Sequence, residues 1–305
     1  MAVPNYTPDN VLLQDAKTGA IPQSVGNLIV KDVMKGSAIM QLARAEEMTA
    51  PKKRFTYLAD GIGAYWVSET ERIQTSKPQY LQAEMEAKKL GVIIPLSKEF
   101  LRYTAKDFFN EVKPMIAEAF YKKFDAAALF GTNTPYGASG KAIFTGAEEE
   151  GNVIADTGNI YTDANDAVIA IEDNEHDPNG ILTTRSFRGK MRKSVDADGR
   201  PLFDGQNELL GLPIAYTQGA SFDKAKAQAL FGDWDYARYG ILQGIEYAIS
   251  EDATLTTLTA DDAGENTGVS LFERDMFALR ATMHVAFMNV KPDAFAALGP
   301  VPVGE

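Results

Sequence analysis

A segment near the end of the printed sequence alternates between two kinds of side chain over a dozen residues. Residues 275–290 read DMFALRATMHVAFMNV, and every second position from Phe277 to Phe287 is apolar, whereas the positions between them are mixed. Side chains of a β-strand point alternately to its two faces, so this pattern predicts a long strand with one wholly apolar face. Such a face must be covered by another element, and this requirement restricts the fold more than any other feature of the chain.

The longest predicted helix can supply this cover. Apolar residues recur at three- and four-residue intervals up to Phe130, and lysines and glutamates occupy the other side. Ser97 is a suitable N-cap for its first part, Pro114 predicts a bend or a local break, and Gly131 predicts its end. Because the helix and the strand lie far apart in the sequence, the residues between them are predicted to form an inserted domain.

The inserted residues predict a unit of mixed helices and strands. Loops rich in Asp, Gly and Thr separate short periodic segments, and no internal repeat is present. The expected helices lie at about Asp163–Asp173 and Ser186–Val195, and the expected strands at Gly180–Thr184, Leu212–Thr217 and Tyr239–Ile249.

Residues 52–95 predict a long two-stranded hairpin whose far half has no apolar face. The first strand contains Phe55 and Tyr57, and the second runs from about Gln79 to Pro95. Between them lies GAYWVSETERIQTSK (63–77), which begins with aromatic and β-branched residues and then becomes polar, without a further glycine or any proline to turn the chain. Such a tract cannot bury much of itself within its own chain.

Composition excludes several classes of protein. The chain has 305 residues, a formal net charge of −12 and a pI near 4.8, so its average charge repels nucleic acid, which basic surfaces bind. The absence of cysteine excludes disulfides, thiolate catalysis and thiolate metal sites. No apolar run reaches the ~18 residues of a membrane span, and the first residues lack the pattern of a signal peptide, as expected for synthesis in the cytoplasm.

No group of residues predicts an active site. His176 is interpreted as a solvated loop residue and His284 as a polar sheet position, and no Gly-x-Ser-x-Gly segment supports a catalytic triad. The segment GASGKA does not match a phosphate-binding loop, because Pro135 and Ala142 stand at two required positions. We therefore predict that the chain is not an enzyme and needs neither a cofactor nor a metal ion.

The order of these parts resembles the major capsid proteins of tailed bacteriophages, whose fold was first seen in phage Hong Kong 97, with the closest likeness to siphophages of Gram-positive bacteria. The segments that carry the resemblance are GAYWVSETERIQTSK, LGVIIPLSKEFLRYT, EVKPMIAEAFYKKFD and LFERDMFALRATMHVAF. The resemblance implies an α+β capsid fold, divided into an N-terminal arm (1–37), an extended E-loop with its base (38–96), the spine helix of the P-domain (97–134), an A-domain (135–270), and the terminal strand and tail of the P-domain (271–305).

The resemblance also gives the polar tract a role, because an E-loop finds its partners on a neighbouring subunit. Aromatic residues and arginine favour interfaces, and charged residues can pair with charges on the neighbour. The residues expected to contact another subunit are Tyr65, Trp66, Ser68, Glu69, Glu71, Arg72 and Lys77. The residues expected to form the core between spine helix and terminal strand are Phe108, Val112, Ile116, Phe120, Phe124, Phe277, Leu279, Met283, Val285 and Phe287.

The implied function is structural: pentamers and hexamers assemble into an icosahedral head that encloses double-stranded phage DNA without binding it specifically. The implied partners are other copies of the chain, a portal protein and a separate scaffolding protein, because the arm has no room for a built-in scaffold; a maturation protease is an additional candidate. The resemblance places the protein in the virion after assembly in the host cytoplasm, with no membrane partner. Two alternatives are an encapsulin-type nanocompartment shell and an oligomeric α+β hydrolase that uses His284.

Overall fold

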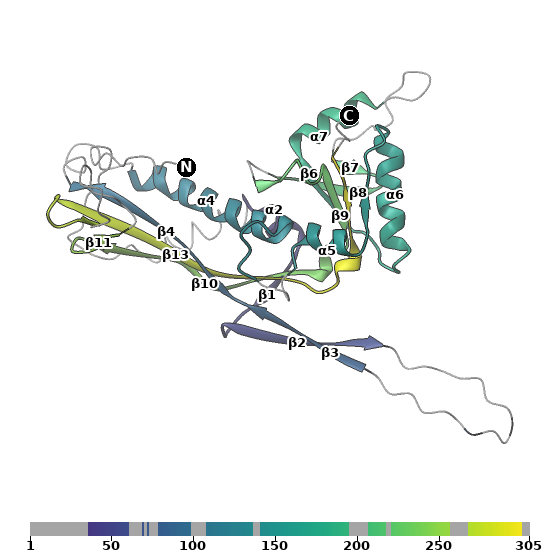
Figure 1. Ribbon diagram of the computed structural model, residues 1–305, viewed down its shortest axis with the longest axis horizontal. Helices are drawn as coiled ribbons and strands as arrows, with labels where there is room; N and C mark the ends of the chain where they lie inside the picture. Colours follow the sequence, from purple (N-terminus) through teal and green to yellow (C-terminus); the bar gives the residue numbers. More distant parts are fainter. Residues whose placement is uncertain are drawn as a thin grey trace.

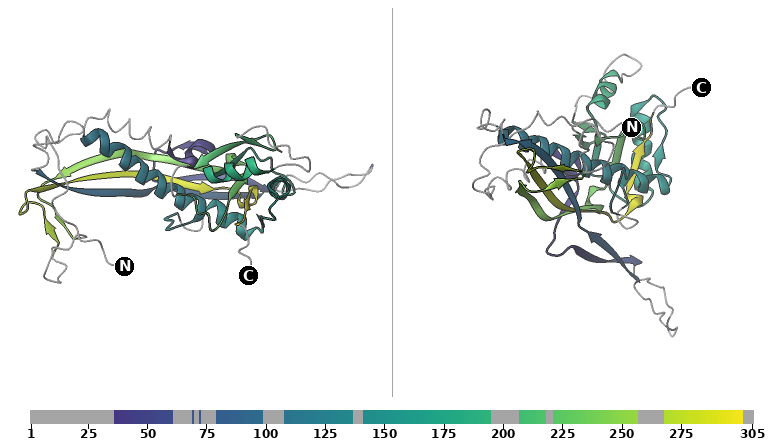
Figure 2. Two further views of the ribbon diagram at one scale, coloured as in Figure 1. Left: turned by 90° about the horizontal axis from the view of Figure 1, so that it is seen from above. Right: turned by 60° about the vertical axis from the view of Figure 1, so that its left-hand side comes forward.

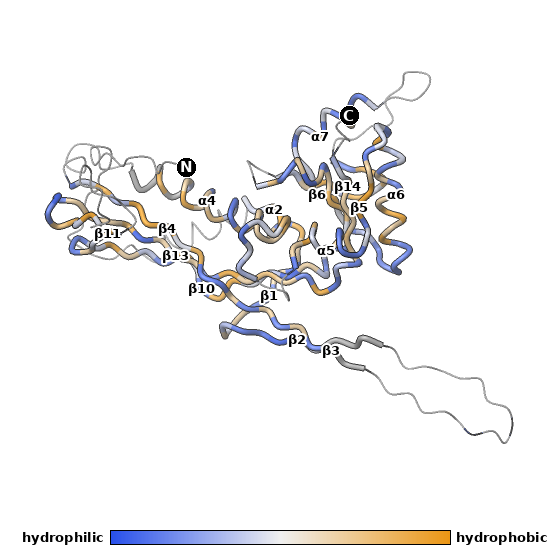
Figure 3. The backbone as a smooth tube through the Cα atoms, viewed as in Figure 1, coloured by the Kyte–Doolittle hydropathy of each residue, from blue (hydrophilic) through white to orange (hydrophobic). Residues whose placement is uncertain are grey.

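The computed structural model describes residues 36–60, 69, 72, 79–98, 108–136, 141–194, 207–217, 221–256 and 268–300. Two sheets form the body, and a β-hairpin extends away from it (Figure 1). The apolar residues concentrate where the long helix meets the first sheet and within the second sheet. The hairpin strand labelled β2 is mostly hydrophilic where it is coloured (Figure 3).

A four-stranded sheet has the predicted C-terminal strand in its interior. That strand, β13, is antiparallel to both of its neighbours, β10 and β4, and β1 is parallel to β10. The apolar positions from Phe277 to Phe287 are at most 3% exposed, in agreement with the alternation in the sequence. In the order in which they lie in the sheet, the strands are β1 (Arg44–Glu47), β10 (Ala237–Ser250), β13 (Met276–Asn289) and β4 (Lys88–Ser97).

Helix α4 (Phe108–Phe130) lies along one face of this sheet (Figures 1 and 2). The helix continues through Pro114, where a bend or break was expected. The ring of Phe124 meets the ring of Phe287 edge-on, with centroids 6.3 Å apart. The predicted N-cap, Ser97, is the last residue of β4, and residues 99–107 lie outside the described part of the chain.

A short helix, α2 (Ala38–Leu42), is fixed to α4 by a buried carboxylate. The hydroxyl of Ser37, which caps α2, donates to Asp125 Oδ1 at 2.6 Å, and the N–H of Ala38 donates to Oδ2 at 3.1 Å. Burial raises the pKa of Asp125 to about 6, although the hydrogen bonds that it accepts act in the opposite direction. These hydrogen bonds hold the first turn of α2 against α4.

A six-stranded sheet forms the second half of the body. One face is covered by α6 and α7, and the other packs against α5 and joins the core beneath α4, so a single apolar core runs between the sheets. Gly232 leaves room for the ring of Phe295, which an added Cβ would approach to 2.2 Å. The strands, in sheet order, are β5 (Val153–Ile154), β14 (Phe295–Leu298), β9 (Ala229–Gly232), β6 (Gly180–Thr184), β8 (Leu212–Thr217) and β7 (Glu208–Leu209); the helices are α5 (Ile143–Glu149), α6 (Ile160–Glu172) and α7 (Arg185–Lys193).

The assignment of strands to sheets differs from the expectation in two places. The strand expected at Tyr239–Ile249 is part of β10 and pairs with β13, although it was assigned to the inserted domain. Conversely, β14 belongs to the terminal residues but pairs with β9 and β5 in the six-stranded sheet. Alternation identifies a strand but carries no information on which sheet it joins, so the chain crosses between the sheets more often than the sequence indicated.

The extended hairpin consists of β2 (Lys52–Asp60) and β3 (Gln79–Glu86), which pair antiparallel. A single strand was expected from Gln79 to Pro95, but Ala87 separates β3 from β4, and the chain changes sheet there. A second, short hairpin of β11 (Thr254–Leu255) and β12 (Val269–Ser270) covers part of the four-stranded sheet at the far end.

Candidate assembly surfaces

The extended hairpin is held to the body by a compact group of residues, here called the hairpin root: Glu46, Lys53, Phe55, Met85 and Arg238. Glu46 accepts hydrogen bonds from Lys53 Nζ at 2.9 Å and from the Arg238 guanidinium at 2.8 Å. The same two cations lie 5.1 Å from the centroid of the Phe55 ring. Burial acts to raise the pKa of Glu46, but its hydrogen bond to Lys53 and the charges of Lys53 and Arg238 outweigh burial and hold it below its usual value.

Met85 supplies the apolar part of the root. Its side chain is fully buried among Met48, Ala286 and Met288, on the face of β13 that points away from α4. On the opposite face of the hairpin, ion pairs from Lys52 and Arg54 to Glu84 join the two strands. Charge and one small apolar cluster therefore fix the direction in which the hairpin leaves the body.

The structure describes only two of the seven residues expected to contact another subunit. Glu69 and Arg72 are exposed, and no described residue pairs with either of them. The other five, Tyr65, Trp66, Ser68, Glu71 and Lys77, lie outside the described residues.

The core residues expected from the sequence have these positions. Ile116, Phe120 and Phe124 are buried on α4, and Val112 is half-buried, whereas the side chain of Phe108 is outside the described set. The expected residues of β13 are all buried: Phe277, Leu279, Met283, Val285 and Phe287.

The face of β13 that points away from α4 is open only in its middle. Ala286 and Met288 at one end are covered by the hairpin root, and Met276 and Ala278 at the other end pack with the β11–β12 hairpin. The residues between them form a surface with both signs of charge, here called the sheet window: Lys89 and Ile93 on β4, Glu246 on β10, and Arg280, Thr282 and His284 on β13.

Ile93 is the apolar centre of the sheet window. Its side chain is 50% exposed and lies opposite Arg280 in the register of β4 with β13. Sequence reasoning missed this surface, although the mixed parity of β13 had already placed Arg280, Thr282 and His284 on one face. The exposure of Ile93 could not be read from the sequence, because GVIIPL has the composition of a buried strand.

Two connections between the sheets lie side by side and form a joint. One passes through η4 (Trp234–Tyr236) and the other through η5 (Pro292–Ala294), and they exchange hydrogen bonds from Val290 N to Tyr236 O and from Asp233 N to Ala294 O. His176 packs here, with its side chain 4% exposed and Nε2 3.3 Å from Asp293 Oδ2. The interpretation of His176 as a solvated loop residue was therefore wrong, because the turn after α6 folds onto the joint.

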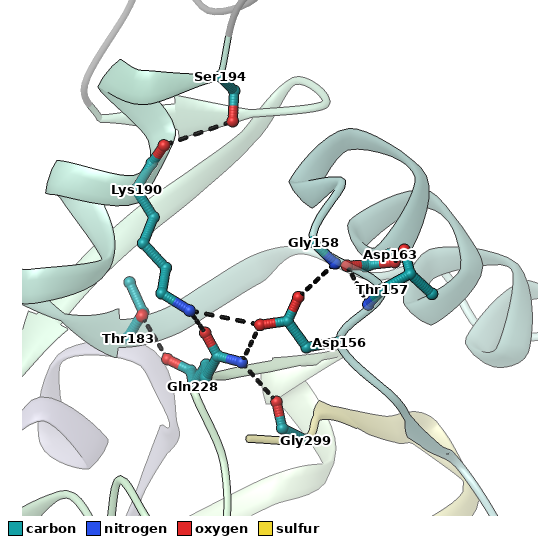
Figure 4. Close-up of polar contacts among 9 residues, drawn as sticks. All are labelled: Asp156, Thr157, Gly158, Asp163, Thr183, Lys190, Ser194, Gln228 and Gly299. Atoms are coloured by element: carbon teal, nitrogen blue, oxygen red, sulfur yellow. Dashed lines mark hydrogen bonds and ion pairs between the residues drawn. The ribbon is translucent and has the colours of Figure 1, made fainter. Parts of the chain in front are cut away.

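A polar network ties α7 to the edge of the six-stranded sheet (Figure 4). Asp156 accepts hydrogen bonds from Gln228 Nε2 at 2.6 Å, from Gly158 N at 2.8 Å and from Lys190 Nζ at 3.3 Å. Gln228 also donates to Gly299 O at 2.7 Å, so the end of β14 is included. Burial acts to raise the pKa of Asp156, but these hydrogen bonds hold it below its usual value. Because these groups satisfy one another, the network has the character of a structural clamp.

Within the described ranges, no three His, Asp or Glu side chains lie close enough together to hold a metal ion. None of the helices that the structure describes combines the length and the apolar character needed to cross a membrane.

Comparisons with known proteins give a consistent result over most of the chain. The profile of a family described as "Phage capsid family" matches residues 18–299. The "Major capsid protein" of Staphylococcus phage 80alpha is 42% identical over 97% of this chain and 89% of its own length. A solved structure from Microbacterium phage Oxtober96 has a TM-score of 0.77 at 29% identity and covers 87% of this chain and 91% of its own.

A more distant solved structure shares the fold alone. A chain described as "Capsid of empty GTA particle computed with C5 symmetry" has a TM-score of 0.61 at 18% identity and covers 87% of this chain and 90% of its own.

Proposed function

Because this chain belongs to the phage capsid family and has the function of a tailed-phage major capsid protein, a component of the icosahedral virion shell, we propose that its extended hairpin joins one copy to the next. The resemblance and the α+β capsid fold expected from the sequence are confirmed by the same matches. Neither alternative, an encapsulin-type shell or an α+β hydrolase, is supported by them.

In this proposal, residues 61–78 at the end of the hairpin dock on the sheet window of a neighbouring copy. The observation that carries it is the direction of β2 and β3, which pair with each other and lead away from both sheets of the body (Figure 1). A hairpin that reaches away from its own core gains stability by burying surface on another molecule. A stable interface usually buries about 1,200–2,000 Å² in total, which a reaching hairpin can supply without enlarging the body.

The chemistry of the two surfaces is complementary. Glu69 and Glu71 can pair with Arg280 and Lys89 of the window, since opposite charges at an interface steer partners into register. Trp66 and Tyr65 can cover the half-exposed Ile93, because aromatic side chains are the usual anchors of interfaces. Arg72 and Lys77 can meet Glu246. Contacts of this kind are head-to-tail, and they close into rings when the rotation from one copy to the next divides a full turn.

The finer partners and location are part of the same proposal. A separate scaffolding protein, a portal protein and a maturation protease would act with the shell, which is assembled in the host cytoplasm. The net charge of −12 supports enclosure of double-stranded DNA without specific binding, because a surface that repels phosphate on average holds no fixed DNA register. We also propose that the chain has no catalytic role, and its membership of a family of shell proteins supports this view.

Deletion of residues 68–77 tests the hairpin contact. We expect a folded chain that forms no closed shells, observed by negative-stain electron microscopy of the purified protein. A matched control replaces the same ten residues with a Gly/Ser segment of equal length, which keeps the reach and removes the chemistry; it should fail in the same way. Normal particles from either variant would contradict the proposal.

The window is tested from the other side by Arg280→Glu, with Arg280→Lys as the control that keeps the charge. We expect the glutamate variant to lose shells and the lysine variant to keep them, with both retaining the thermal stability of the wild type. Equal assembly of the two variants would show that the window receives no acidic segment.

A further inference from the structure

Helix α7 is a wholly basic surface on an acidic protein. Its sequence, RSFRGKMRK, contains five cations and no carboxylate, whereas the chain as a whole carries a net charge of −12. Arg188 and Lys190 are engaged within their own domain, by the Tyr216 ring and by Asp156. Arg185, Arg192 and Lys193 are exposed, and no carboxylate pairs with them in the described part of the chain.

Helix α6 has the opposite character. Residues 160–177 contain six carboxylates and no lysine or arginine. Asp163 is buried near the N-terminus of α6, where it accepts hydrogen bonds from Thr157, but Asp166, Glu172 and Asp173 are exposed. No described residue forms an ion pair with these three.

Two further features of the outer face of α6 favour contact with another molecule: exposed hydrophobic side chains and negative charge at the C-terminal end of the helix. Tyr161 and Ile169 on this helix are 48% and 42% exposed, which places them among the few exposed large hydrophobic residues that the structure describes. Glu172 and Asp173 lie at the C-terminal end of the helix, where the macrodipole disfavours negative charge and no basic residue stands nearby in the last turn. Cations from another molecule would offset both the charge and the dipole.

The two helices occupy different halves of the same sheet face. Helix α6 packs over β5, β14 and β9 at one edge of the six-stranded sheet, and α7 packs on β6 toward the other edge. Figure 1 shows α6 and α7 as separate elements of this half of the molecule. An acidic surface and a basic surface at separate places on one body can meet those of neighbouring copies in a repeating head-to-tail contact.

We propose that α7 of one copy docks on the outer face of α6 of the next copy, through Arg185, Arg192 and Lys193 against Asp166, Glu172 and Asp173. The proposal rests on the shell-forming function and adds to it a second contact between copies, independent of the extended hairpin. The occupant is a second copy because the same chain supplies both complementary surfaces. Tyr161 and Ile169 give this contact an apolar part that charge alone does not provide.

Charge reversal tests the contact. The α7 variant carries Arg185→Glu, Arg192→Glu and Lys193→Glu, and the α6 variant carries Asp166→Lys, Glu172→Lys and Asp173→Lys. Each variant alone should associate at least about tenfold more weakly than the wild type by sedimentation velocity, because like charges then face each other. The chain that carries both sets of changes should recover association.

Mixing the two single-surface variants gives the most specific readout. The α7 variant has two acidic surfaces, and the α6 variant has two basic surfaces. In a 1:1 mixture each acidic surface can therefore meet a basic surface of the other variant. Complexes in which the two variants alternate should form, although neither variant associates alone. A merely structural role for these residues would not produce this result. The control Arg185→Lys, Arg192→Lys and Lys193→Arg keeps every charge and should behave as the wild type.

The outcomes separate this inference from the function on which it rests. If the α7 variant associates normally, or if neither the doubly reversed chain nor the mixture regains association, the α6–α7 contact is overturned while shell formation by the wild type still stands. Wild-type chains that form no shells would instead contradict the shell-forming function itself. Circular dichroism and thermal melting of each variant establish that the folded chain is being compared.

Discussion

The core between the two sheets and the hairpin root are stabilised by different means. The core buries rings and aliphatic side chains from α4, β13 and both sheets in one continuous cluster. The root depends on one carboxylate, two cations and a four-residue apolar cluster, and on the opposite face of the hairpin exposed ion pairs join the two strands. Exposed ion pairs contribute little to stability, whereas apolar burial contributes about 25 cal/mol per Å². The difference indicates a body that is stable alone and an extension that gains stability from a neighbour.

The largest effect is expected in the core. Phe120→Asp places a charge where the side chain is 3% exposed, so we expect a loss of several kcal/mol and no soluble folded protein. The adjacent Ala119→Asp puts the same charge on the exposed side of α4 and should leave the thermal midpoint nearly unchanged. Similar melting curves for the two variants would remove the distinction between the two sides of the helix.

A smaller effect is expected where the root meets the body. Met85→Ala removes a fully buried side chain and should lower the free energy of unfolding by roughly 2–3 kcal/mol in chemical denaturation. The control is Met115→Ala on α4, where the side chain is 66% exposed and little change is expected. Equal losses from the two substitutions would show that the root has no apolar anchor.

The buried carboxylate of α4 gives the core a pH dependence that is opposite in sign to that of the root. The pKa of Asp125 is about 6 in the folded chain and lower in the unfolded chain, so the folded chain binds more protons between these values. The free energy of unfolding therefore falls as the pH rises from about 4 to 6, by on the order of 2 kcal/mol for this group. Asp125→Asn should remove that component, seen as a difference between the two stability–pH curves. Parallel curves would contradict a raised pKa.

The smallest effects are expected for the ion pairs of the hairpin. Glu46→Gln weakens the hydrogen bonds to Lys53 and Arg238 and should cost about 1 kcal/mol at neutral pH. Because the pKa of Glu46 is lowered in the folded chain, this contribution is present above the usual pKa of a glutamate and is lost as the pH falls through the lowered value. Glu84→Gln, at the exposed ion pairs on the opposite face of the hairpin, should cause no measurable change in stability. A larger loss from Glu84→Gln than from Glu46→Gln would reverse the comparison.

The sequence predicted the parts of the fold that rest on strong periodicity. The alternation from Phe277 to Phe287 identified β13 and its buried face, and Leu212–Thr217 coincides with β8. Pairing partners were not predictable, since β10 and β14 joined the sheets opposite to those expected. The break at Ala87 was missed because residues 79–95 read as one extended segment.

The candidate surfaces were predictable only in part. The polar tract after Trp66 stood out because it lacks an apolar face, although most of it lies outside the described residues. The charges of α6 and α7 can be read from the sequence. Their use as two complementary surfaces could not be predicted, because it depends on the two helices covering different halves of one sheet face. His176 was misplaced for a similar reason, because its burial comes from a turn that packs on the joint after the chain has folded.

One strand, β13, forms both the interior of the molecule and the floor of the sheet window. Arg280 and Thr282 alternate on the same backbone with Leu279, Ala281 and Met283, which pack toward α4. A displacement of that backbone moves both sets of side chains at once, because neighbouring residues share it. A load applied at the window is therefore transmitted directly to the packing under α4, so the core resists deformation of the shell at this point.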